Sequence, residues 1–143
     1  MQKEITLNHN DLLVMNLVHY FITEKNYNPV ILHGINDEIW LENMDSDYKL
    51  VRIVSHYIHN AEQLNFDHFK FQKILNNLKK KTFSWKMNVV SIYTSLGDDV
   101  RLVDEEGMVN VLIRNVSEIQ NGKLLEIFPD IVEKTHHEEK GID

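Results

Sequence analysis

Cysteine is absent from this sequence of 143 residues, and so are internal repeats. Disulfide bonds and thiolate metal sites are therefore excluded. Any bound metal ion must be held by histidine, aspartate, glutamate or carbonyl oxygen. The lack of cysteine also fits the reducing environment of the cytosol.

Basic residues are in the minority, with 15 lysines and arginines against 22 aspartates and glutamates, and the net charge is -7. Nucleic acids and anionic lipids are polyanions, so this balance disfavours non-specific binding to either of them. An acidic protein attracts cations more readily. The composition therefore predicts no nucleic-acid partner and leaves cation binding open.

Long hydrophobic runs are missing as well. The most apolar early segment, Asp11 to Ile22, is interrupted by Asn16 and His19 and is shorter than the roughly 20 residues that a bilayer span requires. No basic run precedes it and no small-residue cleavage site follows it, which argues against a signal peptide. Taken alone, the chain is expected to be soluble.

What is present is the composition of one globular domain, with 43% hydrophobic and 26% charged residues. A chain of this length buries roughly two-thirds of the surface that its unfolded form exposes, which is enough for a single core. We expect that domain to span residues 1–133. The segment 134–143, KTHHEEKGID, has no apolar periodicity and is expected to be a polar linker or disordered tail.

The spacing of apolar residues predicts an α+β fold. Two long segments have helical spacing, and the second begins at a capping box formed by Asn60 and Gln63. The expected elements are helices at 11–25, 60–81 and 123–128 and strands at 30–32, 37–43, 48–55, 87–95 and 108–115. This order, α-β-β-β-α-β-(β)-α, favours a central mixed sheet of four to five strands flanked by helices, with the strand at 87–95 in its centre.

The same order suits a restriction-endonuclease-like core, and one motif fits that chemistry. Asp37 is followed later by Asp47, Tyr48 and Lys49, a carboxylate and then an acid-x-lysine. In such enzymes two carboxylates hold a divalent metal ion, and the lysine stabilises charge in the attack on phosphate. The pattern also arises by chance in acidic chains, and Asp47 lies in an expected turn with Asp45. A metal-dependent nuclease is therefore one alternative.

A second group of candidate ligands lies where the third strand leads into the second long helix. His56 and His59 are followed by Asp67 and His68, and imidazole together with carboxylate suits divalent Mn, Zn or Fe. On one straight helix His56 and Asp67 would be about 16 Å apart, so they can share an ion only if the chain bends near Asn60. The alternative is that these are surface histidines at a strand-to-helix corner.

Two further sets of side chains are weaker candidates for a functional site. His136 and His137 precede two glutamates and can bind a transition metal adventitiously, although a hydrophilic tail explains them equally well. Ser55 and Ser91 lack the Gly-x-Ser-x-Gly context of a hydrolase nucleophile. No serine hydrolase site is predicted.

Four segments, in order, resemble one known family. They are DEIWLE (37–42), LVR (50–52), KMNVVSIY (86–93) and LLEIFPD (124–130), and DEIWLE is the most distinctive of them. Together they are similar to the cytosolic N-terminal domain that precedes the membrane part of Gram-positive rhomboid intramembrane serine proteases. The resemblance covers nearly the whole chain.

The resemblance implies a regulatory domain without catalytic residues of its own, tethered at the cytoplasmic face of the membrane. Its partners would be the transmembrane rhomboid domain on its C-terminal side and a membrane transporter as the substrate. Such domains are linked to sensing of divalent cations, here Mn or Zn, weakly bound. The family pattern places the metal ligands at His56, His59 and Asp67, with Tyr57 where another carboxylate is expected.

On this interpretation the stretch DEIWLEN, 37–43, is a structural strand. Ile39 and Leu41 face one layer, while Trp40 packs under a helix or lies at an interface. Asp37 and Glu42 are then expected to be dispensable for metal binding. A domain that binds no metal and only positions the protease against its substrate is the remaining alternative.

Overall fold

The computed structural model describes residues 9–32, 35, 37–83 and 86–132. Its elements, in chain order, are α1 (His9–Thr23), β1 (Asn28–Val30), β2 (Glu38–Glu42), β3 (Tyr48–Val54), α2 (Ala61–Thr82), β4 (Asn88–Tyr93), β5 (Met108–Leu112), the 3-10 helix η1 (Val116–Asn121) and α3 (Lys123–Ile127). This order confirms the predicted α+β class, with the optional fifth strand present.

The five strands form one mixed sheet in the order β1-β2-β3-β4-β5. The first three strands are antiparallel neighbours, whereas β3, β4 and β5 run parallel. Parallel neighbours need a crossover connection, and α2 provides it between β3 and β4. The strand predicted at 87–95 in the centre of the sheet is the interior strand β4, which lies next to the edge strand β5, while β3 has the middle position.

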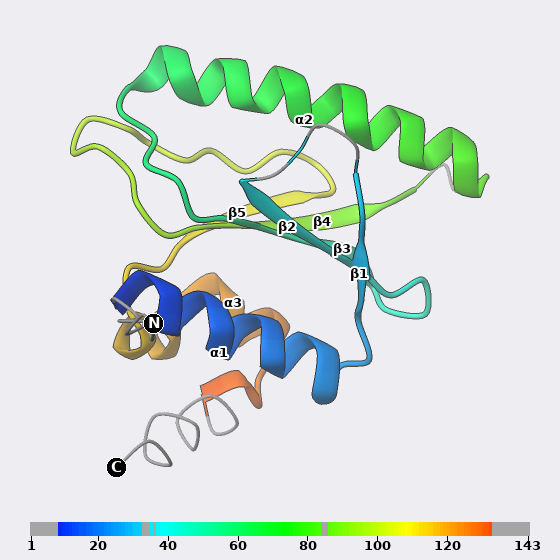
Figure 1. Ribbon diagram of the computed structural model, residues 1–143, viewed down its shortest axis with the longest axis horizontal. Helices are drawn as coiled ribbons and strands as arrows, with labels where there is room; N and C mark the ends of the chain where they lie inside the picture. The colour runs from blue at the N-terminus through cyan, green and yellow to red at the C-terminus, as the bar shows by residue number, and fades with distance from the viewer. Residues whose placement is uncertain (1–8, 33–34, 36, 84–85, 133–143) are drawn as a thin grey trace, which may run out of the picture.

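Helices cover both faces of the sheet (Figure 1). The helix α2 lies along one face, while α1 and α3 lie on the other. Residues of β3 alternate between these layers, because successive side chains of a strand point to opposite faces. Leu50 packs in the cluster with Phe71 of α2, and Val51 packs in the cluster with Phe21 of α1. Trp40 packs under α2, as predicted, with its ring 5.4 Å from that of Phe71.

The start of α2 is fixed by the predicted capping box. The side chain of Asn60 accepts a hydrogen bond from the backbone N–H of Gln63 at 2.8 Å, and the Gln63 side chain accepts one from the N–H of His59 at 2.8 Å. The helix ends at Phe83, which adopts a left-handed conformation with φ 54°. Three lysines occupy its last turn, where the helix dipole is negative.

Gly97, in the segment that follows β4, packs closely against the loop between β3 and α2. Its N–H donates to the carbonyl of Ile58 at 2.8 Å. A side chain at this position would bring its Cβ within 2.5 Å of the backbone oxygen of His59. Only glycine allows the two loops to approach so closely.

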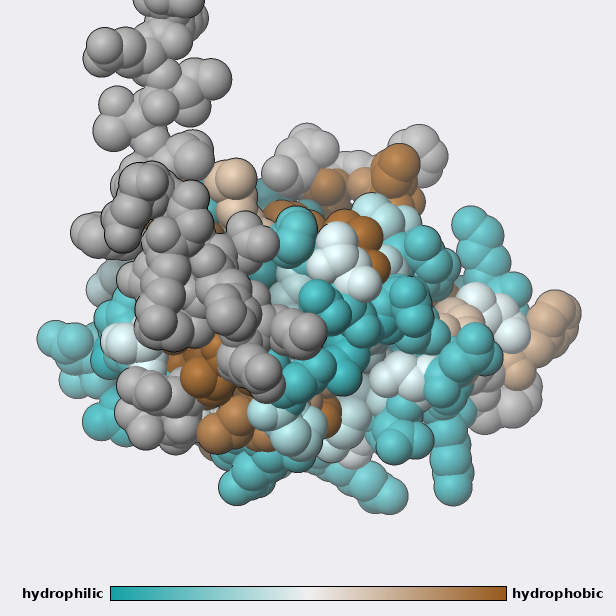
Figure 2. All heavy atoms as spheres, turned by 90° about the horizontal axis from the view of Figure 1, so that it is seen from below, coloured by the Kyte–Doolittle hydropathy of each residue, from teal (hydrophilic) through white to brown (hydrophobic). Residues whose placement is uncertain are grey.

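The remaining differences from the expected elements are shifted ends and one additional element. The first strand is Asn28–Val30 rather than 30–32, and η1 was not predicted. The tail at 134–143, with His136 and His137, lies outside the described residues. In the described part of the chain no helix is both long and apolar enough to cross a membrane. Seen from the side of α1 and α3, the described surface is mostly hydrophilic (Figure 2).

Candidate functional site

The adjoining ends of β2 and β3 bring three potential metal ligands together. Glu38 is paired with Val54 in the antiparallel register, which places His56, two residues further along, beside Asp37 and Glu38. The Nε2 atom of His56 lies 3.7 Å from Oδ2 of Asp37 and 4.0 Å from Oε2 of Glu38. Among the described residues, this is the one group of three acidic or histidine side chains whose ligand atoms lie within 4.8 Å of one another. We call it the acid-histidine cluster.

Glu38 also belongs to a buried network centred on Arg52, which is 1% exposed. The guanidinium donates to the carboxylate of Glu38 from Nε at 2.7 Å and from Nη2 at 2.8 Å. It also donates to Asp67 on α2 and, through Nη1 at 3.2 Å, to the hydroxyl of Tyr93. Trp40 donates its indole N–H to Glu38 at 3.0 Å. The network therefore joins β2, β3, β4 and α2.

Three members of the network, Glu38, Arg52 and Tyr93, have shifted pKa values. Burial alone would raise the pKa of Glu38, but the hydrogen bonds and charge of Arg52 hold that pKa below its ordinary value. Burial would lower the pKa of Arg52, whereas its hydrogen bonds with Glu38 and the nearby negative groups raise it. Burial raises the pKa of Tyr93 to about 12, so its hydroxyl stays protonated at neutral pH.

The structure does not bring the three predicted ligands His56, His59 and Asp67 together. Asp67 is buried, and its carboxylate accepts hydrogen bonds from Arg52 and from Tyr93. His59 is exposed, with its ring 4.5 Å from that of Tyr57. A buried carboxylate needs a nearby positive charge, and here the guanidinium supplies it. Only His56 of the predicted set belongs to a three-ligand group in the described residues.

The nuclease motif is not assembled either. Asp37 precedes β2 at the end of the sheet where Glu38 pairs with Val54. Lys49 lies near the opposite end of β3, five residues before Val54, which corresponds to roughly 17 Å along a strand. Asp47 lies in the turn before β3, on the side of Lys49. The two carboxylates therefore cannot share one metal ion in this arrangement.

The acid-histidine cluster fits a divalent cation in ligand type and spacing. Two carboxylates and an imidazole suit Mn or Zn. Ligand atoms held about 2.1 Å from one ion are roughly 3 to 4 Å apart, close to the separations found here. Asp37 and His56 are open to solvent, with 58% and 30% of their side chains exposed, so an ion can reach them. The positive charge of Arg52 beside Glu38 opposes a second cation, which favours weak binding.

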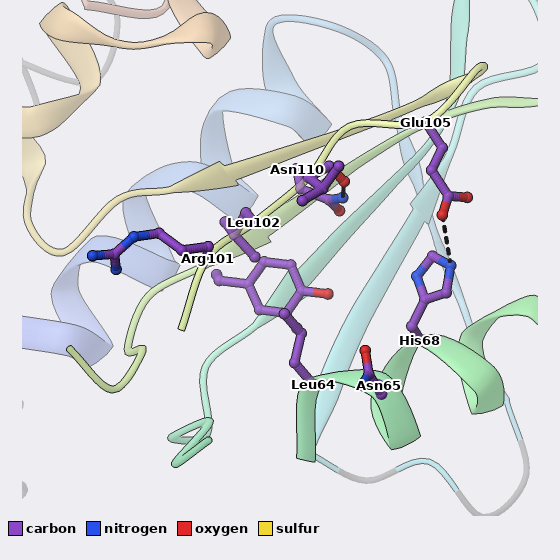
Figure 3. A pocket seen from close by; sticks show the side chains of 9 residues that line it. Leu64, Asn65, His68, Arg101, Leu102, Glu105 and Asn110 are labelled. Atoms are coloured by element: carbon purple, nitrogen blue, oxygen red, sulfur yellow. Dashed lines mark hydrogen bonds and ion pairs between the residues drawn. The ribbon is translucent and has the colours of Figure 1, made fainter. Parts of the chain in front are cut away.

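A small pocket of about 140 Å³ opens on the other side of the network, between α2 and the segment that leads into β5. The Nε2 atom of His68 on α2 lies 3.5 Å from Oε1 of Glu105, and Asn65 lies beside His68 (Figure 3). Arg101 also lines the pocket but points away from the other side chains (Figure 3). Tyr93 connects this pocket to the Arg52 network.

From the sequence alone, Glu38 is not singled out as a candidate metal ligand, and Asp37 is considered only in the nuclease motif, because DEIWLEN is interpreted as a structural strand. The signal that could have found them is the hairpin register. Once the turn at 43–47 is placed between two antiparallel strands, Glu38 falls opposite Val54 and therefore close to His56. Trp40 and Leu41, in contrast, have the structural role that was expected.

No protein-family model matches the chain, and no curated protein matches it by sequence.

Proposed function

We propose that this chain is a non-catalytic regulatory domain on the cytosolic side of a rhomboid intramembrane serine protease and that it binds Mn or Zn through Asp37, Glu38 and His56. The link to the protease is supported by the resemblance of four segments of the sequence. The cation site is supported by the distances within the acid-histidine cluster. The observation that carries the proposal is that the first two residues of DEIWLE converge on His56.

Glu38 connects the cation to the rest of the fold. The same carboxylate accepts hydrogen bonds from Arg52, which also binds Asp67 on α2. A cation beside Glu38 competes with Arg52 for its oxygens and so weakens the connection to α2. Regulation of the protease follows if its active and inactive states hold α2 differently, because a ligand shifts an equilibrium only by its differential affinity for the two states.

Isothermal titration of the purified chain with Zn or Mn tests the cation site. Asp37→Asn and His56→Ala each remove one ligand, and each is expected to weaken binding by at least about ten-fold, the loss that even an outer-shell partner causes. Binding should also weaken as the pH falls, since only the neutral imidazole coordinates a metal ion.

His59→Ala and Glu42→Gln are the matched controls, because each alters a histidine or carboxylate close in sequence but outside the cluster. Both are expected to bind the cation as the wild type does. If His59→Ala weakened cation binding as much as His56→Ala, the cation would bind at the strand-to-helix corner and not at the acid-histidine cluster. In the full-length protease, Asp37→Asn should abolish any dependence of substrate cleavage on Mn.

A further inference from the structure

The outer side of α2 presents aromatic rings to solvent. Phe66 and Phe69 are 64% and 58% exposed, and Phe83 just beyond the helix is 85% exposed. Residues three and four positions apart lie on one side of a helix. Lys70 and Lys73 therefore lie on the same side of α2 as Phe66 and Phe69. The ammonium group of Lys73 lies 4.6 Å from the ring centre of Phe69, and that of Lys70 lies 5.9 Å from the ring centre of Phe66.

The same side of α2 is strongly basic. Lys80 and Lys81 continue the exposed surface toward the C-terminal end of the helix. Within the described part of the chain, none of the lysines of α2 forms an ion pair with a carboxylate. Two lysines elsewhere are paired with carboxylates, Lys25 with Asp130 and Lys123 with Asp104. The exposed acidic residue on this side of α2 is Glu62, in its first turn.

We propose that this side of α2 docks on the surface of an anionic lipid bilayer. We call it the α2 face and define it by Phe66, Phe69, Lys70, Lys73, Lys80 and Lys81. A helix with lysines and exposed aromatic rings on one side can lie in the plane of the membrane interface. The lysines would meet the lipid headgroups and the rings would enter the boundary with the acyl chains.

The position of α2 allows this docking. Its opposite side is buried against the sheet through Phe71 and Leu75. The helix is the outermost layer on its side of the molecule (Figure 1), and its 22 residues extend for about 33 Å. A flat surface can therefore approach the whole α2 face without unfolding any part of the domain.

The net charge of -7 does not prevent this contact. Charges are screened beyond about 8 Å at physiological ionic strength, so a membrane responds to the basic α2 face rather than to acidic residues on distant surfaces. The expectation that the chain avoids anionic lipid holds for the average composition. It does not hold for this helix. A nucleic-acid duplex would use the lysines alone and leave the phenylalanine rings in water, so the rings favour a bilayer over a duplex.

Co-sedimentation of the 143-residue chain with phosphatidylcholine vesicles, with and without phosphatidylserine, tests the proposal. Binding should require phosphatidylserine and decrease as salt is added. Each lysine near an anionic surface contributes about five-fold in affinity, so Lys70→Gln with Lys73→Gln should weaken binding roughly 25-fold. Phe66→Ala with Phe69→Ala should weaken it as well. EDTA in all samples keeps this test independent of the cation site.

Met15→Ala and Arg114→Gln are the controls, since they remove an exposed apolar group and a charge outside the α2 face. Both should sediment as the wild type does, and all variants should show the wild-type melting temperature. Equal binding to neutral vesicles, no binding at all, or equal losses from the controls would overturn the proposal. So would binding to a DNA single strand or a short DNA duplex that depends on the lysines while vesicle binding does not.

Discussion

On the α1 side of the sheet Val51 and Ile53 lie in an apolar cluster, whereas on the α2 side their neighbour Arg52 is buried among charged and aromatic groups. On the α1 side, Lys25 forms an ion pair with Asp130 at the rim of the cluster, and the hydroxyl of Tyr20 donates a hydrogen bond to the same carboxylate. One side of the same strands therefore follows the usual separation of apolar and charged residues. The other side places a charged network in the interior, directly behind the candidate cation site.

This difference shows what the Arg52 network contributes. Replacing a buried ion pair with well-packed apolar residues is often neutral or stabilising, so stability alone does not explain the network. It does fix the carboxylate of Glu38 toward His56 and ties α2 to the sheet through Asp67. We infer that its role is to position these groups.

Arg52→Ala should have the largest effect of any single change. It leaves Glu38 and Asp67 buried without their positive partner and should lower the free energy of unfolding by about 3 to 5 kcal/mol. Urea unfolding followed by circular dichroism measures this loss. An unchanged unfolding midpoint would mean that the network is open to water.

Ile53→Ala makes the matching change on the apolar side of the same strand. The cavity should lower the free energy of unfolding by about 2 to 5 kcal/mol, at the lower end if the α1 side can collapse around it. Because no charge is involved, this loss should be the same at acidic and at neutral pH. A loss that depended on pH would show that the two faces are not energetically separate.

The pH dependence of stability sharpens the contrast further. The pKa of Glu38 is lower in the folded chain than in the unfolded chain, so its stabilising contribution is present above the unfolded value of about 4.3. That contribution is lost as the pH falls below this value toward the folded pKa. Unfolding of Glu38→Gln across the acidic range should therefore show a shallower pH dependence than unfolding of the wild type, and an equal slope would contradict this assignment.

Asn60→Ala should have the smallest effect of this series, about 1 kcal/mol, because it removes one capping hydrogen bond at the start of α2. Thermal unfolding measures it. Asn60→Asp is the control, since aspartate also caps helices. If both variants lost the same stability, the cap would not be the reason.

The sequence predicted those parts of the molecule that depend on local patterns. The capping box at Asn60 and Gln63, the interior position of β4 and the packing of Trp40 under α2 all follow from spacing along the chain. The partner of Asp67 could not be found in this way. Arg52 lies 15 residues away and on another element, so their contact depends on how α2 crosses the sheet.

Only part of the candidate site could be predicted from local sequence patterns. His56 was singled out from the sequence because its residue type suits a metal ion. Its partners Asp37 and Glu38 depend on the register of β2 against β3, which a pattern of alternating residues does not fix without the turn.

The most direct test of the cation site is paramagnetic broadening of backbone amide signals by Mn, measured by NMR on the 143-residue chain. His136→Ala with His137→Ala should be included to remove the histidines of the tail. We predict that broadening begins at Asp37, Glu38 and His56 and is unaffected by the tail substitutions. Broadening that disappears with the tail histidines, or that leaves the signals of Asp37 and His56 unchanged, would contradict the account.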